Sequence, residues 1–451
     1  MSQAKPDVRL HALRDALSES PPLWWSLLYF FSLLCGYYVL RPVRDAMGAS
    51  GDVAAVYPRW LVDWADGSGF ALADYSLQVL FSAVFVAMLL LQPLYGALVS
   101  RFPRRVFLPL VYLLFIACLV GFYWLFHTGV SGRGAAFFIW VAVFNMFAVT
   151  VFWSFMADVF DNEHAKRFYG YIGAGGTIGA LVGPGITRVL AEPLGIANLL
   201  LVSAGFMALC LLCIMRLRPW AIRRERLHGG PSGEAAMGGS VLAGLRLVWQ
   251  KPLLRALAIT LFFGVGVGTL LYNEQAAIVR QFYPDAESAT RFYAMIDWAV
   301  NGLTLVIQLL LTRWLLRRYG VAPVLLGPAI AILFGYCLLA ASPLPMLVAI
   351  VQVVTRAGEF SLGKPGRETL YTRVDRESRY KAKAFIDTAI YRGGDLTFVW
   401  LHKAVALLGS TAVFATGIAV AAAMTAGAWG IVRAQRGLPE DPAESPRPIG
   451  K

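Results

Sequence analysis

Long apolar stretches alternate with short polar ones along almost the whole chain. Each apolar stretch holds about 20 residues, the length that an α-helix needs to cross a hydrocarbon core of ~30 Å. A helix also satisfies its own backbone hydrogen bonds, as the inside of a bilayer requires. The pattern predicts helices at 22–47, 73–99, 106–127, 134–157, 168–190, 197–216, 253–274, 289–313, 321–341, 344–362, 381–402 and 407–432. The sequence therefore predicts an all-α polytopic membrane protein with twelve transmembrane helices.

These stretches form two sets of six, separated by a polar, glycine-rich segment with many arginines. We predict an N-terminal half at 22–217, a central linker at 218–252 and a C-terminal half at 253–433, with polar ends at 1–21 and 434–451. The N-terminal end carries six charged side chains and lacks the apolar core and cleavage site of a signal peptide. We therefore expect the first helix to remain as an anchor.

Basic side chains gather in every second loop and in the central linker, whereas the opposite loops hold few. This alternation follows the positive-inside rule and predicts that both termini lie in the cytoplasm. The expected location is the inner membrane of a bacterium, which the family resemblance described below implies. Topology thus explains the formal net charge of +13, and we do not expect nucleic-acid binding. Only 15% of the residues are charged, against about a quarter in soluble proteins, so the lipid bilayer is the expected surrounding.

The two halves also resemble each other in their loops. "YGALVSRFPRR" (Tyr95–Arg105) has a counterpart in "TRWLLRRYG" (Thr312–Gly320), and "DNEHAKRFYG" (Asp161–Gly170) has one in "DRESRYKAKA" (Asp375–Ala384). Repeated six-helix halves with a substrate site between them are the plan of major facilitator transporters. The first loop also resembles the loop signature of that superfamily. The sequence therefore predicts a 6+6 major-facilitator-like arrangement.

Arg356 lies near the middle of the predicted helix 344–362. A guanidinium at that depth costs ~3 to over 10 kcal/mol unless it faces a partner or water. Gln352 and Glu359 share its helical face, and this polar stripe continues into Lys364 and Arg367. The stripe predicts a helix that lines a cavity, in which Arg356 binds an anionic group.

Helix 381–402 carries a second polar stripe, formed by Asp387, Tyr391 and Asp395 at four-residue spacing with Arg392 beside them. Arg356 and Arg392 can hold a phosphate or carboxylate together, because guanidinium groups bind such anions bidentately. Structural ion pairs, Arg356 with Glu359 and Arg392 with Asp395, are the alternative.

The outer end of the first helix, "LRPVRDAMG", holds Arg41, Arg44 and Asp45. Pro42 predicts an irregular backbone there, and the charges either extend to the membrane interface or serve binding and gating. Glu274, in the repeat-related seventh helix, either faces Arg41 or Arg44 across the outer mouth or lies at the membrane interface in contact with solvent.

Helix 289–313 carries Asp297 and Asn301 on one face. A deep acidic side chain of this kind predicts either proton coupling or an ion pair with an arginine.

Glycines recur every fourth residue in "GYIGAGGTIGALVGPG" (Gly170–Gly185), at Gly175, Gly179 and Gly183. This spacing predicts close packing against another helix. With Pro184 it also resembles the G-x-x-x-G-P signature of antiporters in the superfamily.

Three blocks resemble the ATP/ADP translocases of intracellular bacteria and plastids and their relatives in free-living bacteria. They are "YYVLRPVRDAMG", "VFWSFMADVFDNEHAKRFYGYIGAGG" and "GKPGRETLYTRVDRESRYKAKAFIDTAIYRGG". The resemblance implies nucleotide exchange and places Arg44 and Glu274 on functional positions. In the third block the matching positions are Arg367, Glu368, Tyr371, Asp375, Lys381, Lys383, Asp387, Arg392 and Gly394. The chain departs from that family at Asn145, the only polar side chain where a glutamate is expected early in the fourth helix, and at Asp395, which replaces a lysine.

We therefore predict a secondary carrier that moves an anionic solute, with ATP and ADP as candidates, by alternating access. One alternative is a proton-coupled carrier of another small molecule that uses Asp297 or Glu274. The other is a transporter-like membrane sensor that does not transport. No catalytic triad, metal-ligand cluster or cofactor motif stands out, so we expect neither an enzyme nor a cofactor.

Overall fold

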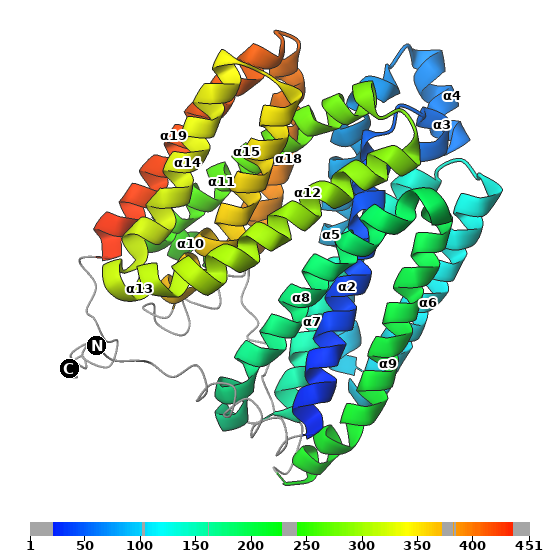
Figure 1. Cartoon of the computed structure of the whole chain (residues 1–451), viewed down its shortest axis with the longest axis vertical. Helices are drawn as coiled ribbons and strands as arrows, with labels where there is room; N and C mark the ends of the chain where they lie inside the picture. The colour runs from blue at the N-terminus through cyan, green and yellow to red at the C-terminus, as the bar shows by residue number, and fades with distance from the viewer. Residues whose placement is uncertain are drawn as a thin grey trace. The chain divides into compact units, whose positions relative to one another are not determined.

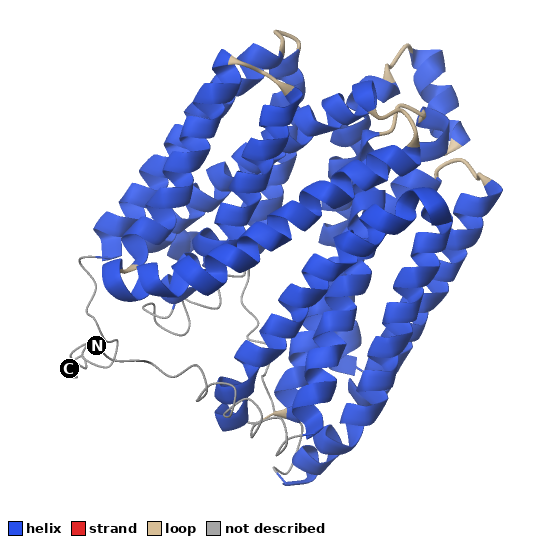
Figure 2. Ribbon diagram, viewed as in Figure 1, coloured by secondary structure: helices blue, strands red, loops and turns tan. Residues whose placement is uncertain are grey.

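The computed structural model describes residues 21–101, 104–160, 162–227, 241–371, 382 and 385–435. These residues form helices joined by short loops, and none of them is in a β-strand (Figure 2). The prediction of an all-α fold is confirmed.

The described residues of the N-terminal part of the chain include six long helices, whose arrangement can be followed in Figure 1. They are α2 (Pro21–Ala49), α5 (Ser76–Arg101), α6 (Arg104–Thr128), α7 (Arg133–Val159), α8 (Asn162–Leu194) and α9 (Ile196–Leu227). The short helices α3 (Val53–Val56), α4 (Arg59–Ser68) and η1 (Leu72–Tyr75) connect α2 to α5. The apolar pattern does not predict these connecting helices, because each of them is too short to span a bilayer.

The C-terminal part begins with the short α10 (Val241–Gln250) and repeats the series of long helices. These are α11 (Pro252–Phe282), α12 (Ala286–Ile307), α13 (Arg313–Tyr319), α14 (Val321–Ala341), α15 (Pro345–Gly358), α16 (Lys364–Tyr371), α18 (Tyr391–Ala406) and α19 (Ser410–Gln435). Three π-helical turns interrupt the series: η2 (Gln308–Thr312) joins α12 to α13, η3 (Glu359–Gly363) joins α15 to α16, and η4 (Ile386–Ile390) precedes α18.

Ten helical segments among the described residues are long and apolar enough to cross a membrane. Among the twelve predicted helices, 168–190 lies on α8, which has 33 residues but a glycine-rich sequence of lower hydropathy. The predicted helix 381–402 lies on η4 and α18 and partly outside the described residues. The chain is a multi-span membrane protein, and twelve spanning helices fit its structure.

Residue contacts divide the chain into two compact units. Within the described residues, unit 1 consists of 21–69, 86–227 and 285–298, and unit 2 consists of 70–85, 241–284 and 299–435. The start of α12 thus belongs to unit 1 and the start of α5 belongs to unit 2. The halves predicted from the sequence, 22–217 and 253–433, do not include this exchange of helix segments.

The start of α12 is fixed in unit 1 by its cap and by contacts with α8. Asp285 accepts a hydrogen bond from the backbone N–H of Ser288 at 2.8 Å, and its hydrogen bonds with Ser288 lower the pKa of the Asp285 carboxyl. Arg291 forms an ion pair with Glu192 of α8 at 2.6 Å, with both side chains about half exposed. These contacts place the first turns of α12 beside α8.

In unit 1, α2 packs against α7, α8 and α9. The prediction of an irregular backbone at Pro42 is wrong, because α2 continues through this residue to Ala49. Proline keeps a helical φ angle and removes one hydrogen-bond donor. Val39, Leu40 and Val43 around it are fully buried, and this packing offsets the missing hydrogen bond.

The three spaced glycines of α8 lie directly against the backbone of α2. A Cβ atom at Gly175, Gly179 or Gly183 would lie 2.8, 2.3 or 2.6 Å from the carbonyl oxygens of Leu27, Phe31 and Cys35, respectively. Because those three carbonyls are also four residues apart, the two helices pack in register. The packing interpretation of the glycine motif is confirmed.

In unit 2, α11 packs against α15, α18 and α19. The hydroxyl of the fully buried Tyr336 on α14 donates a hydrogen bond to the carbonyl of Val267 on α11 at 2.6 Å. The π-helical turns η2 and η3 also bind each other, because Gln308 and Thr312 donate to the carbonyls of Phe360 and Ser361 at 3.2 and 2.9 Å. Side chains of one turn thus satisfy backbone oxygens of the other, as irregular backbone inside a membrane requires.

Candidate functional site

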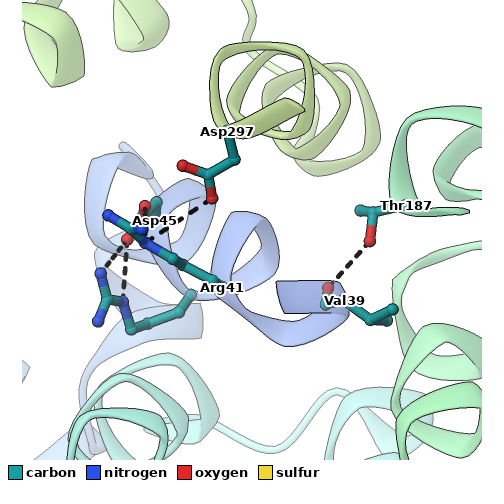
Figure 3. A network of polar contacts seen from close by, with 6 residues as sticks. Val39, Arg41, Asp45, Thr187 and Asp297 are labelled. Atoms are coloured by element: carbon teal, nitrogen blue, oxygen red, sulfur yellow. Dashed lines mark hydrogen bonds and ion pairs between the residues drawn. The ribbon is translucent and has the colours of Figure 1, made fainter. Parts of the chain in front are cut away.

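Unit 1 contains a compact group of charges at the end of α2 (Figure 3). The Arg41 Nε atom lies 3.8 Å from Asp45 Oδ2 and 3.7 Å from Asp297 Oδ2, and Arg44 Nη2 lies 2.5 Å from Asp45 Oδ1. The side chains of Asp45 and Asp297 are only 3% and 2% exposed. Two guanidinium groups therefore neutralise two buried carboxylates, as buried charges require.

Aromatic rings complete the surroundings of this group. The Arg41 guanidinium lies 5.7 Å from the ring centroid of Tyr38, and the Arg44 guanidinium lies 5.1 Å from that of Phe138. Such cation–π contacts stabilise a charge that is partly removed from water. Arg41 and Arg44 are thus held inside unit 1 rather than extended to an interface.

Asp297 forms the ion pair with an arginine that was one of the two alternatives offered for it, since its carboxylate contacts Arg41. The other alternative, proton coupling at Asp297, stays a prediction. Asn301, one turn further along α12, is also buried. In the chain, α12 belongs to the second repeat, and Asp297 therefore ties the start of this helix to α2.

In unit 2, α15 carries Gln352, Thr355 and Arg356 within just over one turn. Gln352 and Thr355 are 3% and 5% exposed, and neither the Gln352 Oε1 atom nor the Thr355 Oγ1 atom has a hydrogen-bond partner among the described residues. Arg356 is half-buried. It lies 11 residues beyond Pro345, which corresponds to ~17 Å along the helix and to the middle of a bilayer core.

Glu359 does not form the predicted pair with Arg356. Its carboxylate binds Arg367 in a bidentate ion pair, with Arg367 Nη1 2.9 Å from Glu359 Oε2. A Cβ atom at Gly363 would lie 2.5 Å from Glu359 Oε2, so the glycine makes room for this side chain. The prediction assumed a regular α-helix, whereas η3 begins at Glu359 and changes which residues share a face.

The stripe predicted on the eleventh helix changes for the same reason. The π-helical turn η4 covers Asp387, so Asp387, Tyr391 and Asp395 do not follow a regular four-residue spacing. The Asp387 side chain lies outside what the structure describes, as do Asp375, Lys381 and Lys383. Tyr391 is 41% exposed.

Arg392 and Asp395 form the predicted structural pair. Arg392 Nη1 lies 3.3 Å from Asp395 Oδ2, and Thr269 of α11 donates a hydrogen bond to Asp395 Oδ1 at 3.3 Å. The aspartate that replaces a lysine of the translocases thus binds Arg392 and connects α18 to α11.

Glu274 lies in a run of three buried polar residues, Asn273, Glu274 and Gln275, on α11. Its Oε1 atom lies 2.8 Å from Nε2 of His402 on α18. The predicted pairing of Glu274 with Arg41 or Arg44 would join the two units and stays a prediction. Within unit 1, Arg41 contacts Asp45 and Asp297, and Arg44 contacts Asp45.

His402 is the site residue that sequence reasoning missed. The sequence held a usable signal, because His402 interrupts the apolar run "FVWLHKAVALL" and follows Asp395 by seven residues, or two helical turns. Its place on the same helical face as Asp395 becomes clear only once α18 is known to pack against α11.

The family model of the Major Facilitator Superfamily matches residues 61–363. ADP,ATP carrier protein 1 of Chlamydia muridarum is 22% identical over 86% of this chain and 81% of its own length. The multidrug efflux pump Tap of Mycolicibacterium fortuitum is 26% identical over 43% of this chain and 44% of its own length. Among solved structures, an auto-inhibited peptide transporter of the POT family superposes with a TM-score of 0.58 at 16% identity, covering 95% of this chain and 99% of that one. The predicted resemblance to the ATP/ADP translocases is confirmed, and all these relatives are transporters.

Proposed function

Because the chain belongs to the major facilitator superfamily and is a secondary transporter that works by alternating access, we propose that its substrates are nucleotides, exchanged across the membrane. The proposal joins two kinds of support. Similarity to an ADP,ATP carrier extends over most of the chain. The position of Arg356 along α15, 11 residues beyond Pro345, supports an arginine at membrane depth.

The observation that carries the proposal is Arg356. It lies half-buried at mid-membrane depth, beside two buried side chains, Gln352 and Thr355, whose oxygen atoms have no hydrogen-bond partner within the described ranges. A guanidinium binds phosphate through paired N–H groups, and the Thr355 hydroxyl can donate a further hydrogen bond to it, whereas the Gln352 oxygen accepts one from a hydroxyl or amine of the same ligand. A polyphosphate matches this combination better than a neutral sugar or an apolar compound does.

We propose that Arg392 and Arg367 also bind substrate phosphates, on the condition that the carboxylates now bound to them are displaced. Each is bound by a carboxylate, from Asp395 and Glu359 respectively. A phosphate can replace a carboxylate at a guanidinium with little change in geometry. These carboxylates therefore neutralise the arginines while no substrate is bound, and release them to a nucleotide.

We further propose that the membrane is the inner membrane of a bacterium, with both termini in the cytoplasm. The support is the alternation of basic loops along the sequence. A reporter fused after residue 451 is expected to be active if it is green fluorescent protein and inactive if it is alkaline phosphatase. The opposite pair of activities would reverse the topology.

Nucleotide binding can be tested with purified protein in detergent. A ligand that binds only the folded state stabilises it by RT ln(1 + [L]/Kd), about 2.7 kcal/mol at 100 times Kd. We expect ATP and ADP to raise the midpoint of thermal unfolding, and adenosine and ribose to leave it unchanged. Arg356→Ala should lose most of this shift, whereas Arg433→Ala, at the exposed end of α19, should retain it. Equal shifts from ATP and adenosine would contradict the assignment of a phosphate site.

The second candidate function is a proton-coupled carrier of another solute. The buried pair of Glu274 and His402 favours it, because titratable side chains at such depth are typical of proton relays. A stabilising shift from a non-nucleotide solute, with none from ATP or ADP, would select this candidate.

A further inference from the structure

Glu274 and His402 are two ionisable side chains that face each other inside unit 2. They are 7% and 8% exposed and come from α11 and α18. The distance of 2.8 Å between Glu274 Oε1 and His402 Nε2 is that of a hydrogen bond, so one proton lies between these atoms.

The second ring nitrogen of His402 gives this pair an atom that can bind a further proton. Nδ1 is buried and has no hydrogen-bond partner among the residues that the structure describes. If Nε2–H donates to the Glu274 carboxylate, Nδ1 keeps a lone pair that can accept a proton. Proton uptake at Nδ1 then changes the net charge of the pair from −1 to 0.

The two helices that carry the pair, α11 and α18, meet in a second polar contact that includes Arg392. Asn273, next to Glu274, donates a hydrogen bond to the Thr269 carbonyl at 2.8 Å. The Thr269 hydroxyl donates to Asp395, which binds Arg392. His402 lies two turns beyond Asp395 on α18 and Glu274 lies five residues beyond Thr269 on α11, so the two contacts between these helices are one to two turns apart.

The other ionisable groups near this level have partners of their own. Lys403 lies 4.5 Å from the ring centroid of Tyr75, and Arg280 donates to the Ala73 carbonyl. On α14, Tyr336 is close enough to interact electrostatically with Glu274, and its hydroxyl donates to Val267. Ionisable residues also lie on the pair's own helices and on the elements around them. On α11 and α18 they are Arg255, Tyr272, Arg280, Tyr391, Arg392, Asp395 and Lys403. On the surrounding elements they are Asp74 and Tyr75 of η1, Arg246 of α10, Tyr336 and Cys337 of α14, Arg356 of α15, Asp387 of η4 and Arg433 of α19.

We propose that Glu274 and His402 form a proton-binding site that couples proton movement to the exchange of the anionic substrate. The proton binds at His402 Nδ1 and offsets one negative charge while Arg392 passes between Asp395 and a substrate phosphate. This inference rests on the proposed transport function, since coupling needs a transported solute, but proton binding itself does not.

Proton binding is tested first, without substrate. Protein labelled with ¹⁵N-histidine is compared with His402→Gln and Glu274→Gln by NMR between pH 5 and 9. We expect one imidazole signal, absent in His402→Gln, to shift with pH and to shift differently in Glu274→Gln. A His402 signal that stays constant over this range would overturn the proposal.

Coupling is tested in proteoliposomes with labelled ADP and a clamped membrane potential. For one proton per substrate, a gradient of one pH unit, acid outside, should raise accumulation about tenfold over equal pH. His402→Gln should show a ratio near one relative to its own exchange at equal pH, whereas His127→Gln, at the exposed end of α6, should respond like the wild type.

The proposed coupling would be overturned if the pH gradient left ADP accumulation by the wild type unchanged, or if it raised accumulation by His402→Gln as much as by the wild type. Absence of any ADP exchange at equal pH would instead refute the proposed function. The NMR titration would still show whether His402 binds a proton, because it needs no substrate.

Discussion

Arg41→Met is expected to lower the free energy of unfolding by about 3–5 kcal/mol, the usual effect of removing one partner of a buried ion pair. The substitution removes the guanidinium that lies 3.7 Å from Asp297 and 3.8 Å from Asp45, both almost fully buried. Methionine keeps the length of the side chain, so the effect reports the charge rather than a cavity. The midpoint of thermal unfolding in detergent is the measurement.

The chain supplies a matched control for this prediction. Arg291 and Glu192 form another ion pair of α12 in unit 1, here with α8, but both side chains are about half exposed. Exposed pairs contribute only ~0–1 kcal/mol, so Arg291→Met should change the midpoint little. The double variant Arg41→Met, Asp297→Leu should recover part of the loss. Equal effects of Arg41→Met and Arg291→Met would show that the group in unit 1 is not a buried charge cluster.

Among the substitutions that add a single methyl group to unit 1, Gly179→Ala is expected to lower the stability of the fold most. The added Cβ would lie 2.3 Å from the Phe31 carbonyl oxygen, a backbone atom that cannot move without α2. Overpacking of this kind typically costs ~1–3 kcal/mol, and more where backbone must shift. We expect a lower thermal midpoint and a loss of correctly folded protein on size-exclusion chromatography.

Gly173→Ala, on the same helix, is the control for Gly179→Ala. A Cβ atom at Gly173 meets nothing within 4 Å. Alanine is the better helix former by ~1 kcal/mol, so this variant should be as stable as the wild type or slightly more stable. If both substitutions had the same effect, α2 and α8 would not be in contact through the glycine face.

The helices could be predicted from the sequence because a bilayer imposes one length and one polarity on each of them. The range 321–341 agrees with α14 at both ends, where a glycine precedes the helix and a proline-containing loop follows it. The C-terminal ends of α9 and α11 extend about three and two turns beyond the predicted ends, since helices continue past the apolar core. The short α3 and α4 lie outside the membrane pattern and were therefore missed.

The partners of the site residues were harder to predict than their positions. Arg392 with Asp395 follows from spacing on one regular helix, and this pair was anticipated. Glu359 with Arg367 depends on the π-helical turn η3, for which the sequence carries no clear signal. Glu274 with His402 joins residues 128 positions apart, and only the packing of α18 on α11 brings them together.

The central claim is that this protein exchanges nucleotides and binds their phosphates through Arg356. Counterflow in proteoliposomes tests it most directly: vesicles loaded with unlabelled ATP are diluted into labelled ADP at equal pH. We expect transient accumulation of label that requires internal ATP, that falls about ten- to a hundredfold in Arg356→Ala, and that persists in Arg433→Ala. Label that fails to accumulate in the wild type, or that accumulates equally in Arg356→Ala, would contradict the claim.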